Sequence, residues 1–489
     1  MTRSTLMTRI KKLLFTIVLT LSALQAAFAQ SQDTAQNPGT ILLDSVHIID
    51  VTVGTVSDIQ QVLLRDGRIV AIGDSVADTI DSNANILRID GNNGYLMPGL
   101  MDMHAHIRHP LAESLIFPQF VANGVTGIRE MNSECDGPQS GAPCLQQMQS
   151  WQQRIDAGEL VGPRLLALSS FPVNPPWDYE ATEEQIRGLV AEMDNRGVDL
   201  IKAYFRLSPQ AFRWLADEAG RRELMVSGHL PVPMTVTEAV QAGLDSLEHA
   251  RDLLFDCFPG SSEFRSTQRT QNPSVEWLQR MVSEHNSAQC EQILQTMADN
   301  DTWYVPTHVT RRMDAMAGDS AFRNDPRRQY IWPEILQSWD ADADNMLAMA
   351  PSPEERAIVA SFYHKGLELT GQAQESGVRI LMGTDSGDSF SYFGASAHDE
   401  LQELVKAGLT PAQALQAATV DAAEFLGMQS DYGSVTEGKV ADLILLRANP
   451  LEDISNSTSL EAVFMGSRYY DRGALDAMLQ NVVEAIAAM

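Results

Sequence analysis

The central part of the chain alternates short apolar runs with longer amphipathic stretches. Apolar runs of this length predict buried strands, and the stretches between them predict helices. One helix is predicted from the capping residue Thr182 to near Gly197, and another from Thr410 to about Gly427. The strand candidates are residues 99–104, 124–129, 164–168, 198–204, 224–229, 246–249, 303–307 and 378–385. This alternation predicts a parallel α/β fold, and eight strands predict a closed (β/α)8 barrel of the TIM type.

Both ends of the predicted barrel are flanked by a β pattern instead. Asp66-Gly67 separates two apolar alternations, which is a strong hairpin signal. A similar pattern returns at 440–446 and 462–465, so we expect both chain ends to share one small domain. The predicted units are a β-sandwich from 30–96 and 431–475, a metal-binding barrel over 97–430, and a C-terminal helix over 476–489. The long connections 250–302 and 308–377 are expected to overhang the barrel mouth.

The first 29 residues have the pattern of a secretory signal peptide. Four basic residues precede an apolar run from 13 to about 24, and Ala27-Phe28-Ala29 follows as a cleavage site. The apolar run is short for a membrane span. We therefore expect residues 1–29 to be removed and the protein to be periplasmic or secreted, without a stable membrane anchor. An uncleaved N-terminal anchor is the alternative.

The net charge limits the classes of binding partner, and the cysteines bear on disulfide formation in an oxidising compartment. A formal net charge of −29 argues against nucleic acid as a partner, because phosphate backbones require basic surfaces. After cleavage about 460 residues would remain, enough for a barrel and a small companion domain. In an oxidising compartment the four cysteines can form two disulfides. The local pairs are preferred over free thiols, and they are Cys135 with Cys144 and Cys257 with Cys290.

Six residues with metal-binding side chains follow the predicted strands in order. They are His104, His106, Lys202, His229, His249 and Asp385. Because residues i and i+2 of a strand point to the same side, His104 and His106 can share one cation. Four imidazoles and a carboxylate suit zinc or a similar divalent ion. A single histidine on an apolar strand is more often a core residue, so the prediction depends on the complete ordered set.

Lys202 is unusual because it lies inside an apolar strand. The chain after residue 29 contains only four lysines, and such side chains usually face solvent. An ammonium group beside two dications would be repelled and poorly solvated. Reaction of the amine with carbon dioxide would instead give an anionic carbamate that can bridge two metals. The alternative is a lysine whose charged end reaches the strand terminus.

This pattern resembles the amidohydrolase superfamily, in the branch that holds imidazolonepropionase-like, prolidase-like and N-acyl-amino-acid hydrolases. The family has His-x-His on strand 1, Lys or Glu on strand 4, His on strands 5 and 6, and Asp on strand 8. The resemblance covers about residues 40 to 475. It implies that His104, His106 and Asp385 bind a buried metal and that His229 and His249 bind a more exposed one. It also implies N6-carboxylated Lys202 and a hydroxide as bridges between the metals, with Asp385 as general base.

Three further residues are candidates for contact with substrate. Tyr204 shares the strand face of Lys202 and could hydrogen-bond a developing oxyanion. His308 follows strand 7 and could contact substrate or a residue that supports the site. Arg129 ends strand 2 and could bind a substrate carboxylate. For each of them a purely structural role is the alternative.

The predicted function is hydrolysis of an amide bond in a small substrate by a binuclear metal enzyme. The substrate classes are a dipeptide such as Xaa-Pro, or an N-acyl amino acid. The expected cofactors are two divalent ions, with zinc as first choice, and carbon dioxide as the lysine carbamate. The alternatives are a mononuclear cyclic-amide hydrolase or deaminase, a lactone or organophosphate hydrolase, and an inactive binding protein. Edge strands of the small domain also leave a homo-oligomer open.

Overall fold

The computed structural model describes residues 39–80, 86–107, 109–133, 144–177, 179–270 and 272–489. The predicted signal peptide lies outside these residues. The predicted Cys135–Cys144 pair does too, because Cys135 is not among them. Within the described part of the chain, no helix combines the length and the apolar character needed to cross a bilayer.

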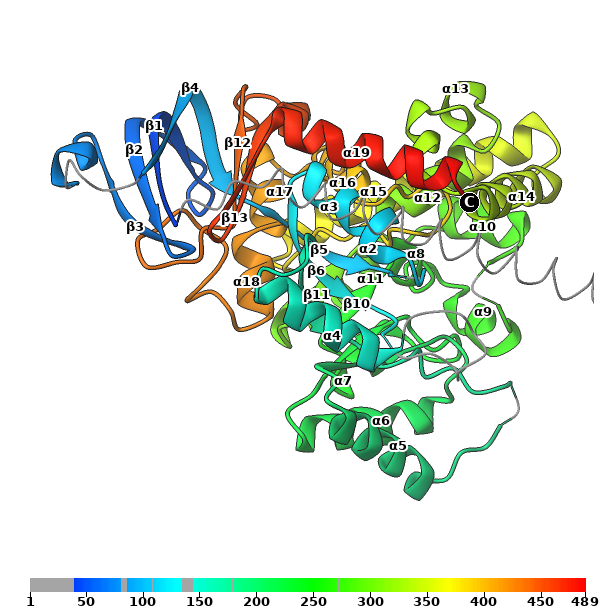
Figure 1. The fold of residues 1–489 in the computed structure, drawn as a ribbon. Helices are drawn as coiled ribbons and strands as arrows, with labels where there is room; N and C mark the ends of the chain where they lie inside the picture. Colours follow the sequence, from blue (N-terminus) through cyan, green and yellow to red (C-terminus); the bar gives the residue numbers. More distant parts are fainter. Residues whose placement is uncertain (1–38, 81–85, 108, 134–143, 178, 271) are drawn as a thin grey trace, which may run out of the picture.

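Segments from both chain ends form one seven-stranded sheet in the order β14-β13-β12-β4-β1-β2-β3. The contributing strands are β1 (Thr40–Asp50), β2 (Thr55–Arg65), β3 (Arg68–Gly73), β4 (Leu87–Pro98), β12 (Leu443–Leu446), β13 (Leu460–Met465) and β14 (Arg468–Asp471). Asp66 and Gly67 both have positive φ, 49° and 78°, as a tight hairpin turn requires. Antiparallel pairing of β12 with β4 joins the two ends. Figure 1 shows this sheet as a separate layer beside the barrel.

The barrel consists of two runs of parallel strands. One contains β5 (Leu100–Ala105), β6 (Val125–Glu130) and β7 (Arg164–Leu168); the other contains β8 (Leu200–Ala203), β9 (Met225–Gly228), β10 (Ser246–Glu248) and β11 (Trp303–Val305). Parallel bridges Ser169–Leu200 and Val173–Ala203 connect β7 to β8. The predicted (β/α)8 fold is therefore confirmed for seven regular strands.

The eighth position is held by the segment 378–385, which is not a regular strand. Parallel bridges Tyr304–Ile380 and Ala105–Ser386 connect it to β11 and to β5, and these bridges close the barrel. Side-chain hydrogen bonds replace part of the missing ladder. Oδ1 of Asp102 accepts from Thr384 N at 2.9 Å, and its Oδ2 accepts from Thr384 Oγ1. The Asp102 side chain thus fixes the position of residues 378–385, which lack regular backbone pairing.

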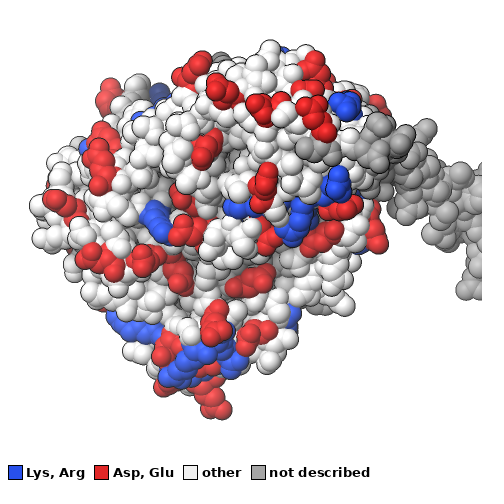
Figure 2. Space-filling view, turned by 90° about the vertical axis from the view of Figure 1, so that its left-hand side faces the viewer, with Lys and Arg blue, Asp and Glu red and all other residues white. Residues whose placement is uncertain are grey.

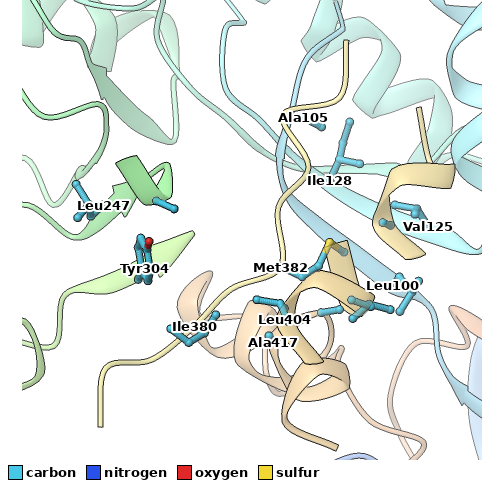
Figure 3. Close-up of a cluster of buried hydrophobic side chains, with 14 of the residues drawn as sticks. Leu100, Ala105, Val125, Ile128, Leu247, Tyr304, Ile380, Met382, Leu404 and Ala417 are labelled. Carbon is cyan, nitrogen blue, oxygen red and sulfur yellow. The ribbon is translucent and has the colours of Figure 1, made fainter. Parts of the chain in front are cut away.

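Helices surround the barrel and separate it from solvent. They are α2 (Ala112–Leu115), α3 (Phe117–Ala122), α4 (Leu145–Asp156), α5 (Glu183–Arg196), α6 (Pro209–Arg221), α7 (Val236–Gln241), α16 (Ala395–Lys406), α17 (Pro411–Ala417) and α18 (Val420–Phe425). Thr182 forms the predicted capping box of α5, and Gly197 ends it with φ 82°. Figure 3 shows the hydrophobic core between strands and helices, where Leu100 and Met382 lie near Leu404 and Ala417.

The single helix predicted from Thr410 to Gly427 is wrong, since α17 and α18 are separate helices. The break at Ala418 and Thr419 has a physical cause. Ala418 O accepts a hydrogen bond from Met101 N of β5 at 2.8 Å, and Ala417 O accepts from Met382 N at 3.0 Å. Because these two carbonyls accept hydrogen bonds from barrel segments, they do not accept the backbone hydrogen bonds that would continue α17.

The two long connections are mainly helical. They contain α8 (Ala250–Leu254), α9 (Ser261–Thr267), α10 (Val275–Ser283), α11 (Ser287–Asp299), α12 (His308–Met316), α13 (Ser320–Arg323), α14 (Pro333–Met349) and α15 (Pro353–Glu375). A disulfide joins Cys257 to Cys290 across the first connection. The last helix, α19 (Arg472–Ala487), begins before the predicted residue 476, because the Asp471 side chain caps it through Ala474 N.

Acidic side chains are scattered over the face of the molecule that Figure 2 shows. Figure 2 shows red patches spread across one face, with blue side chains in smaller groups beside them. Arg187 forms ion pairs with Asp217 and Glu183 between α5 and α6. The exposed acids contribute to the formal net charge of −29.

Candidate metal centre and active site

The six predicted metal ligands converge at the carboxyl ends of the barrel strands. His104 and Lys202 lie in β5 and β8, and His106, His229 and His249 directly follow β5, β9 and β10. Asp385 is the last residue of the eighth segment. All six are buried, with at most 7% of any residue exposed. Active sites of such barrels form at this end of the strands. Ligands that lie far apart in the sequence therefore lie close together in the structure.

Two glycines permit this approach of the strands. A Cβ on Gly383 would lie 2.5 Å from Val305 Cγ1 and 2.9 Å from His104 Cβ, which is closer than carbon atoms can pack. A Cβ on Gly228 would lie 2.2 Å from Ala203 O, and the φ of this glycine is 139°. Each glycine precedes a predicted ligand by one or two residues. Close backbone contact therefore positions both ligands.

His104, His106 and Asp385 form the tightest group. Their ligand atoms all lie within 4.8 Å of one another. Asp385 Oδ1 is 2.9 Å from His106 Nε2 and 3.6 Å from His104 Nε2. Lys202 Nζ is 3.1 Å from His104 Nε2, so the lysine reaches the same point. Two imidazoles and a carboxylate at this separation can hold a divalent ion.

His229 and His249 complete the cluster. The ring centroid of His249 lies 4.2 Å from that of His229 and 4.9 Å from that of His104. His249 Nδ1 is 3.8 Å from Asp385 Oδ2. Among the described residues, His106 Nδ1, His229 Nδ1 and His249 Nε2 are buried ring nitrogens without a hydrogen-bond partner. An unsatisfied buried nitrogen is costly, and a bound metal would satisfy His249 Nε2, whose Nδ1 contacts Thr307. The donor set therefore fits a metal centre.

A buried carboxylate orients His104 from behind. Glu248 Oε2 lies 2.6 Å from His104 Nδ1, and Arg129 Nη2 donates to Glu248 Oε1 at 2.7 Å. Arg129 also donates to the carbonyl of Met103 and to Ser246 Oγ. It is fully buried and does not line the cavity, so the expectation that Arg129 binds a substrate carboxylate is wrong. Its guanidinium neutralises Glu248 instead.

His249 is fixed in a similar way by a hydroxyl group. Its Nδ1 lies 2.8 Å from Thr307 Oγ1, which leaves Nε2 directed away from this contact. His249, Thr307 and Asp385 all have positive φ, at 72°, 47° and 53°. Non-glycine residues in this region are strained, and such strain concentrates at functional sites. The fold holds these three side chains where relaxed strands would not.

Burial and nearby cations keep His104, His229 and His249 neutral. Burial, together with the charge of Lys202, lowers the pKa of His104 to about 4. Burial also lowers the pKa values of His229 and His249 well below the usual range. The pKa of Asp385 falls despite burial, because His104 and His106 favour its charged form. At neutral pH His104, His229 and His249 are therefore neutral and Asp385 is a carboxylate, the protonation states that metals bind.

A cavity of about 660 Å³ lies against the cluster. Its lining includes His106, Lys202, His229, His249 and Asp385, together with Tyr204, Arg251, Arg311, Phe362 and Tyr363. Tyr204 packs on His229 with ring centroids 4.2 Å apart, so the predicted candidate does reach the site. This volume suits a small organic substrate.

His308 is not part of the cavity lining. Its Nε2 lies 2.9 Å from Thr370 Oγ1, and its backbone N donates to Glu400 Oε1. The side chain is fully buried behind the site. The expectation that it contacts substrate is therefore wrong, and the alternative of a supporting role remains.

Sequence reasoning missed Glu248, Thr307 and Arg251. The signal for Glu248 was present, since an acid inside an apolar strand beside a predicted ligand needs a buried partner. Thr307 gives no comparable signal, because its contact to His249 depends on an unusual backbone conformation. Arg251 opens a helix, and its direction toward the cavity cannot be read from the sequence.

Comparisons with known proteins agree with this site. Residues 282–468 match the model of the amidohydrolase family, and they contain Asp385. Ochratoxinase from Aspergillus niger is 23% identical over 412 residues, which cover 73% of this chain and 71% of that protein.

Solved structures share the fold. Bottromycin amidohydrolase superposes with a TM-score of 0.71 at 22% identity, covering 95% of this chain and 93% of the other. A putative prolidase from Bifidobacterium longum gives 0.62 at 23% identity, covering 91% and 100%. Proteins of this family generally use divalent metals, and the His-His-Asp group provides a place for one. The chain is therefore similar to hydrolases of the amidohydrolase family in residues 282–468, and it shares the fold of these solved structures.

Proposed function

We propose that this protein is a binuclear metal-dependent hydrolase of the amide bond in a dipeptide, such as an Xaa-Pro dipeptide, or in an N-acyl amino acid. The observation that carries the proposal is the convergence of four histidines, one aspartate and one lysine on a cavity. Three of the buried ring nitrogens lack partners among the described residues. The name of the putative prolidase from Bifidobacterium longum, whose fold resembles that of this chain, supports the substrate class.

The two halves of the cluster would hold one ion each. His104, His106 and Asp385 would bind the buried ion, and His229 with His249 the second. When bound, the ions would polarise the scissile carbonyl and lower the pKa of water to about 7. Zinc is the first choice for this donor set. Protein side chains would supply the additional ligand and would transfer the protons.

Lys202 would contribute as a carbamate. Its unprotonated amine adds to carbon dioxide with loss of one proton, which replaces a cation by an anionic oxygen donor. The side chain is 1% exposed and Nζ lies 3.1 Å from His104 Nε2, so it is placed among the ligands. An ammonium group at this point would repel divalent ions. The modification would remove that repulsion.

Asp385 would move the proton during hydrolysis. Its carboxylate is ionised at neutral pH, and it is the acid at the centre of the ligand cluster. It would take a proton from the attacking water and return it to the departing amine, as general acid–base catalysis requires. Tyr204, which lines the cavity beside His229, would donate its hydroxyl hydrogen to the developing oxyanion.

The first test is the metal content of the purified protein, combined with its intact mass under native, non-acidic conditions. We expect about two ions per chain and an added mass of about 44 Da for carbon dioxide. The variant Lys202→Met should lack this added mass. Release of amino acids from dipeptides and N-acyl amino acids would then be assayed. One ion without added mass would instead favour the mononuclear cyclic-amide hydrolase or deaminase.

Export from the cytoplasm is a separate part of the proposal, and it rests on residues 1–29 alone. Its test is the N-terminal sequence of the protein recovered from its native source. A mature chain that begins near Gln30 supports cleavage, and a chain that retains Met1 contradicts it.

A further inference from the structure

Part of the cavity wall is apolar, in contrast to the group of metal ligands. The ligands lie at the ends of strands, but much of the remaining lining comes from helices of the two long connections. Here α15 packs against α10 and α12, and α12 packs against α14 (Figure 1). The apolar side chains that these four helices contribute to the lining are Leu278, Met313, Met346, Met349, Val359 and Phe362. We call these six residues the apolar wall.

The residues of the apolar wall follow helical spacing. Val359 and Phe362 are three residues apart on α15, and Met346 and Met349 are three residues apart on α14, so each pair lies on one helix face. Val359 and Phe362 are buried, while both methionines stay partly exposed. Water against apolar side chains is unfavourable, so an apolar group that displaces it from this wall would bind more tightly.

Tyr363 extends this apolar surface on α15. It is four residues after Val359 and lines the cavity, but its hydroxyl donates a hydrogen bond to Glu403, which is completely buried and outside the lining. The polar end of the Tyr363 side chain is therefore engaged behind the wall, and its ring is the part that borders the cavity.

The apolar wall begins close to a candidate metal ligand. A Cβ on Gly366 of α15 would lie 3.6 Å from the Cβ of Ala250, the residue directly after His249. Phe362 is four residues before Gly366 and Val359 is seven, which corresponds to about 6 Å and about 10 Å along the helix axis. The wall therefore extends away from the more exposed metal position, starting beside it.

The charged side chains of the lining occupy other parts of the cavity. Outside the ligand cluster they are Arg251, Arg311, Asp314, Asp342 and Asp388. Arg311 pairs with Asp314 at 2.5 Å. Asp342 accepts a hydrogen bond from Ser389, so this end of α14 lies just after the eighth segment. Met349 is seven residues further along α14, about 10 Å along its axis. The acidic and the apolar ends of this helix face therefore border different parts of the cavity.

We propose that the apolar wall is a subsite for an aliphatic or aromatic group of the substrate, at least as large as a leucine side chain. Its residues would determine specificity. The proposal rests on the proposed amide hydrolysis and narrows its substrates to those dipeptides or N-acyl amino acids that carry such a group next to the scissile amide. Flexible methionine side chains adapt to groups of different shape, which suits aliphatic and aromatic groups alike.

The test uses two series of compounds that differ only in apolar length. On the acyl side they are N-acetylglycine, N-butanoylglycine and N-hexanoylglycine, and on the amine side Gly-Gly, Gly-Ala and Gly-Leu. The holoenzyme would be assayed with each compound, and thermal unfolding would be recorded with the same compounds. The variants are Met349→Gln and Val359→Thr, which keep the side-chain size but add polarity. Met316→Gln is the matched control, because Met316 is partly exposed on α12 and outside the lining.

We expect wild-type kcat/KM to rise about two- to fourfold for each added carbon in at least one series, up to the gain of a fully buried methylene. The rise should come mainly from a lower KM, because the contact exists before the reaction begins. Met349→Gln and Val359→Thr should reduce kcat/KM about 10-fold for the longest compound and less than twofold for the shortest. Met316→Gln should behave as wild type.

The subsite is overturned if kcat/KM of the wild type is independent of length in both series, or if both folded variants keep the wild-type rise. If the wild type hydrolyses none of the compounds, the proposed amide hydrolysis fails instead. Thermal shifts then still decide on the subsite. Greater stabilisation by the long compounds, lost in the two variants and kept in Met316→Gln, supports it, and equal shifts for long and short compounds overturn it.

Discussion

Glu248 Oε2 lies 2.6 Å from His104 Nδ1, and both side chains are completely buried. A carboxylate at this position accepts the Nδ1 hydrogen, which leaves the lone pair of Nε2 free to face Asp385 and Lys202. Burial would raise the pKa of Glu248, but Arg129 and His104 lower it to about 2. The pair thus selects the histidine tautomer that a metal requires.

The first prediction concerns the variant Glu248→Gln. Loss of the carboxylate should reduce metal affinity about 10- to 100-fold, the usual effect of removing a group that orients a ligand histidine. It should also destabilise the fold by about 3–5 kcal/mol, because Arg129 would remain buried without its partner. Competition with a chelator measures the first effect, and denaturant unfolding of the metal-free protein measures the second.

Glu461→Gln is the control for this variant. Glu461 pairs with Arg447 at 3.0 Å, but the two side chains are 40% and 75% exposed. Such a pair contributes at most about 1 kcal/mol. If Glu248→Gln resembles this control in stability and in metal affinity, Glu248 does not orient His104.

The second prediction concerns the hydroxyl group of Tyr204. Tyr204→Phe should keep the ring contact with His229 while removing a donor from the cavity. We expect kcat to fall about 100-fold with little change in KM, because an oxyanion donor acts mainly in the transition state. Steady-state kinetics on the best dipeptide or N-acyl amino acid measures this. Tyr179→Phe is the control, since Tyr179 is 49% exposed. Unchanged kcat in Tyr204→Phe would assign Tyr204 to packing alone.

The barrel and its ligands could be predicted because both depend on local patterns. Strand periodicity places side chains, and parallel strands bring their carboxyl ends together, so His104, His229 and His249 must meet once the barrel closes. The eighth segment was also found, although its lack of regular strand pairing was not predictable. Asp102 and Thr384 hold it through side chains.

Contacts between distant segments could not be predicted in the same way. The break between α17 and α18 arises because Met101 of β5 competes for the carbonyl of Ala418. Arg129 seemed available for substrate because nothing in its own segment shows that Glu248 lies across the barrel. In both cases the deciding partner is more than a hundred residues away, and single-strand patterns carry no information about it.

The third prediction concerns stability against pH. The folded pKa of His104 is about 4, below the 6.5 of an exposed histidine. Between these values the unfolded chain binds more protons, so stability should be complete above pH 6.5 and decrease as the pH falls toward 4. This side chain contributes at most about 3 kcal/mol to the change. Bound metal acts in the same direction, because protons compete with it.

Denaturant unfolding of the metal-free protein between pH 7.5 and 4.5 checks this prediction. The control is His104→Gln, which should show a shallower dependence over the same range. A free energy of unfolding that stays constant, or rises, as the pH is lowered would contradict the neutral state of the buried histidines.

The last prediction concerns the disulfide between Cys257 and Cys290. It closes a loop of 33 residues that begins just after α8, the helix that carries Arg251. Chain entropy for such a loop corresponds to about 4 kcal/mol of stability. The double variant Cys257→Ala and Cys290→Ala should lose at least this amount, because both cysteines are also fully buried. Denaturant unfolding under oxidising conditions measures the loss.

The position of the disulfide also predicts a selective effect on the cavity. Loosening residues 257–290 should increase the mobility of Asn272, a neighbour of Arg251, while the ligands on β5 and β8 keep their places. We therefore expect KM to rise in the double variant, with metal content unchanged. Metal analysis and kinetics on the same preparation distinguish an effect on KM from a loss of metal. Loss of metal together with activity would instead show that the disulfide supports the whole barrel mouth.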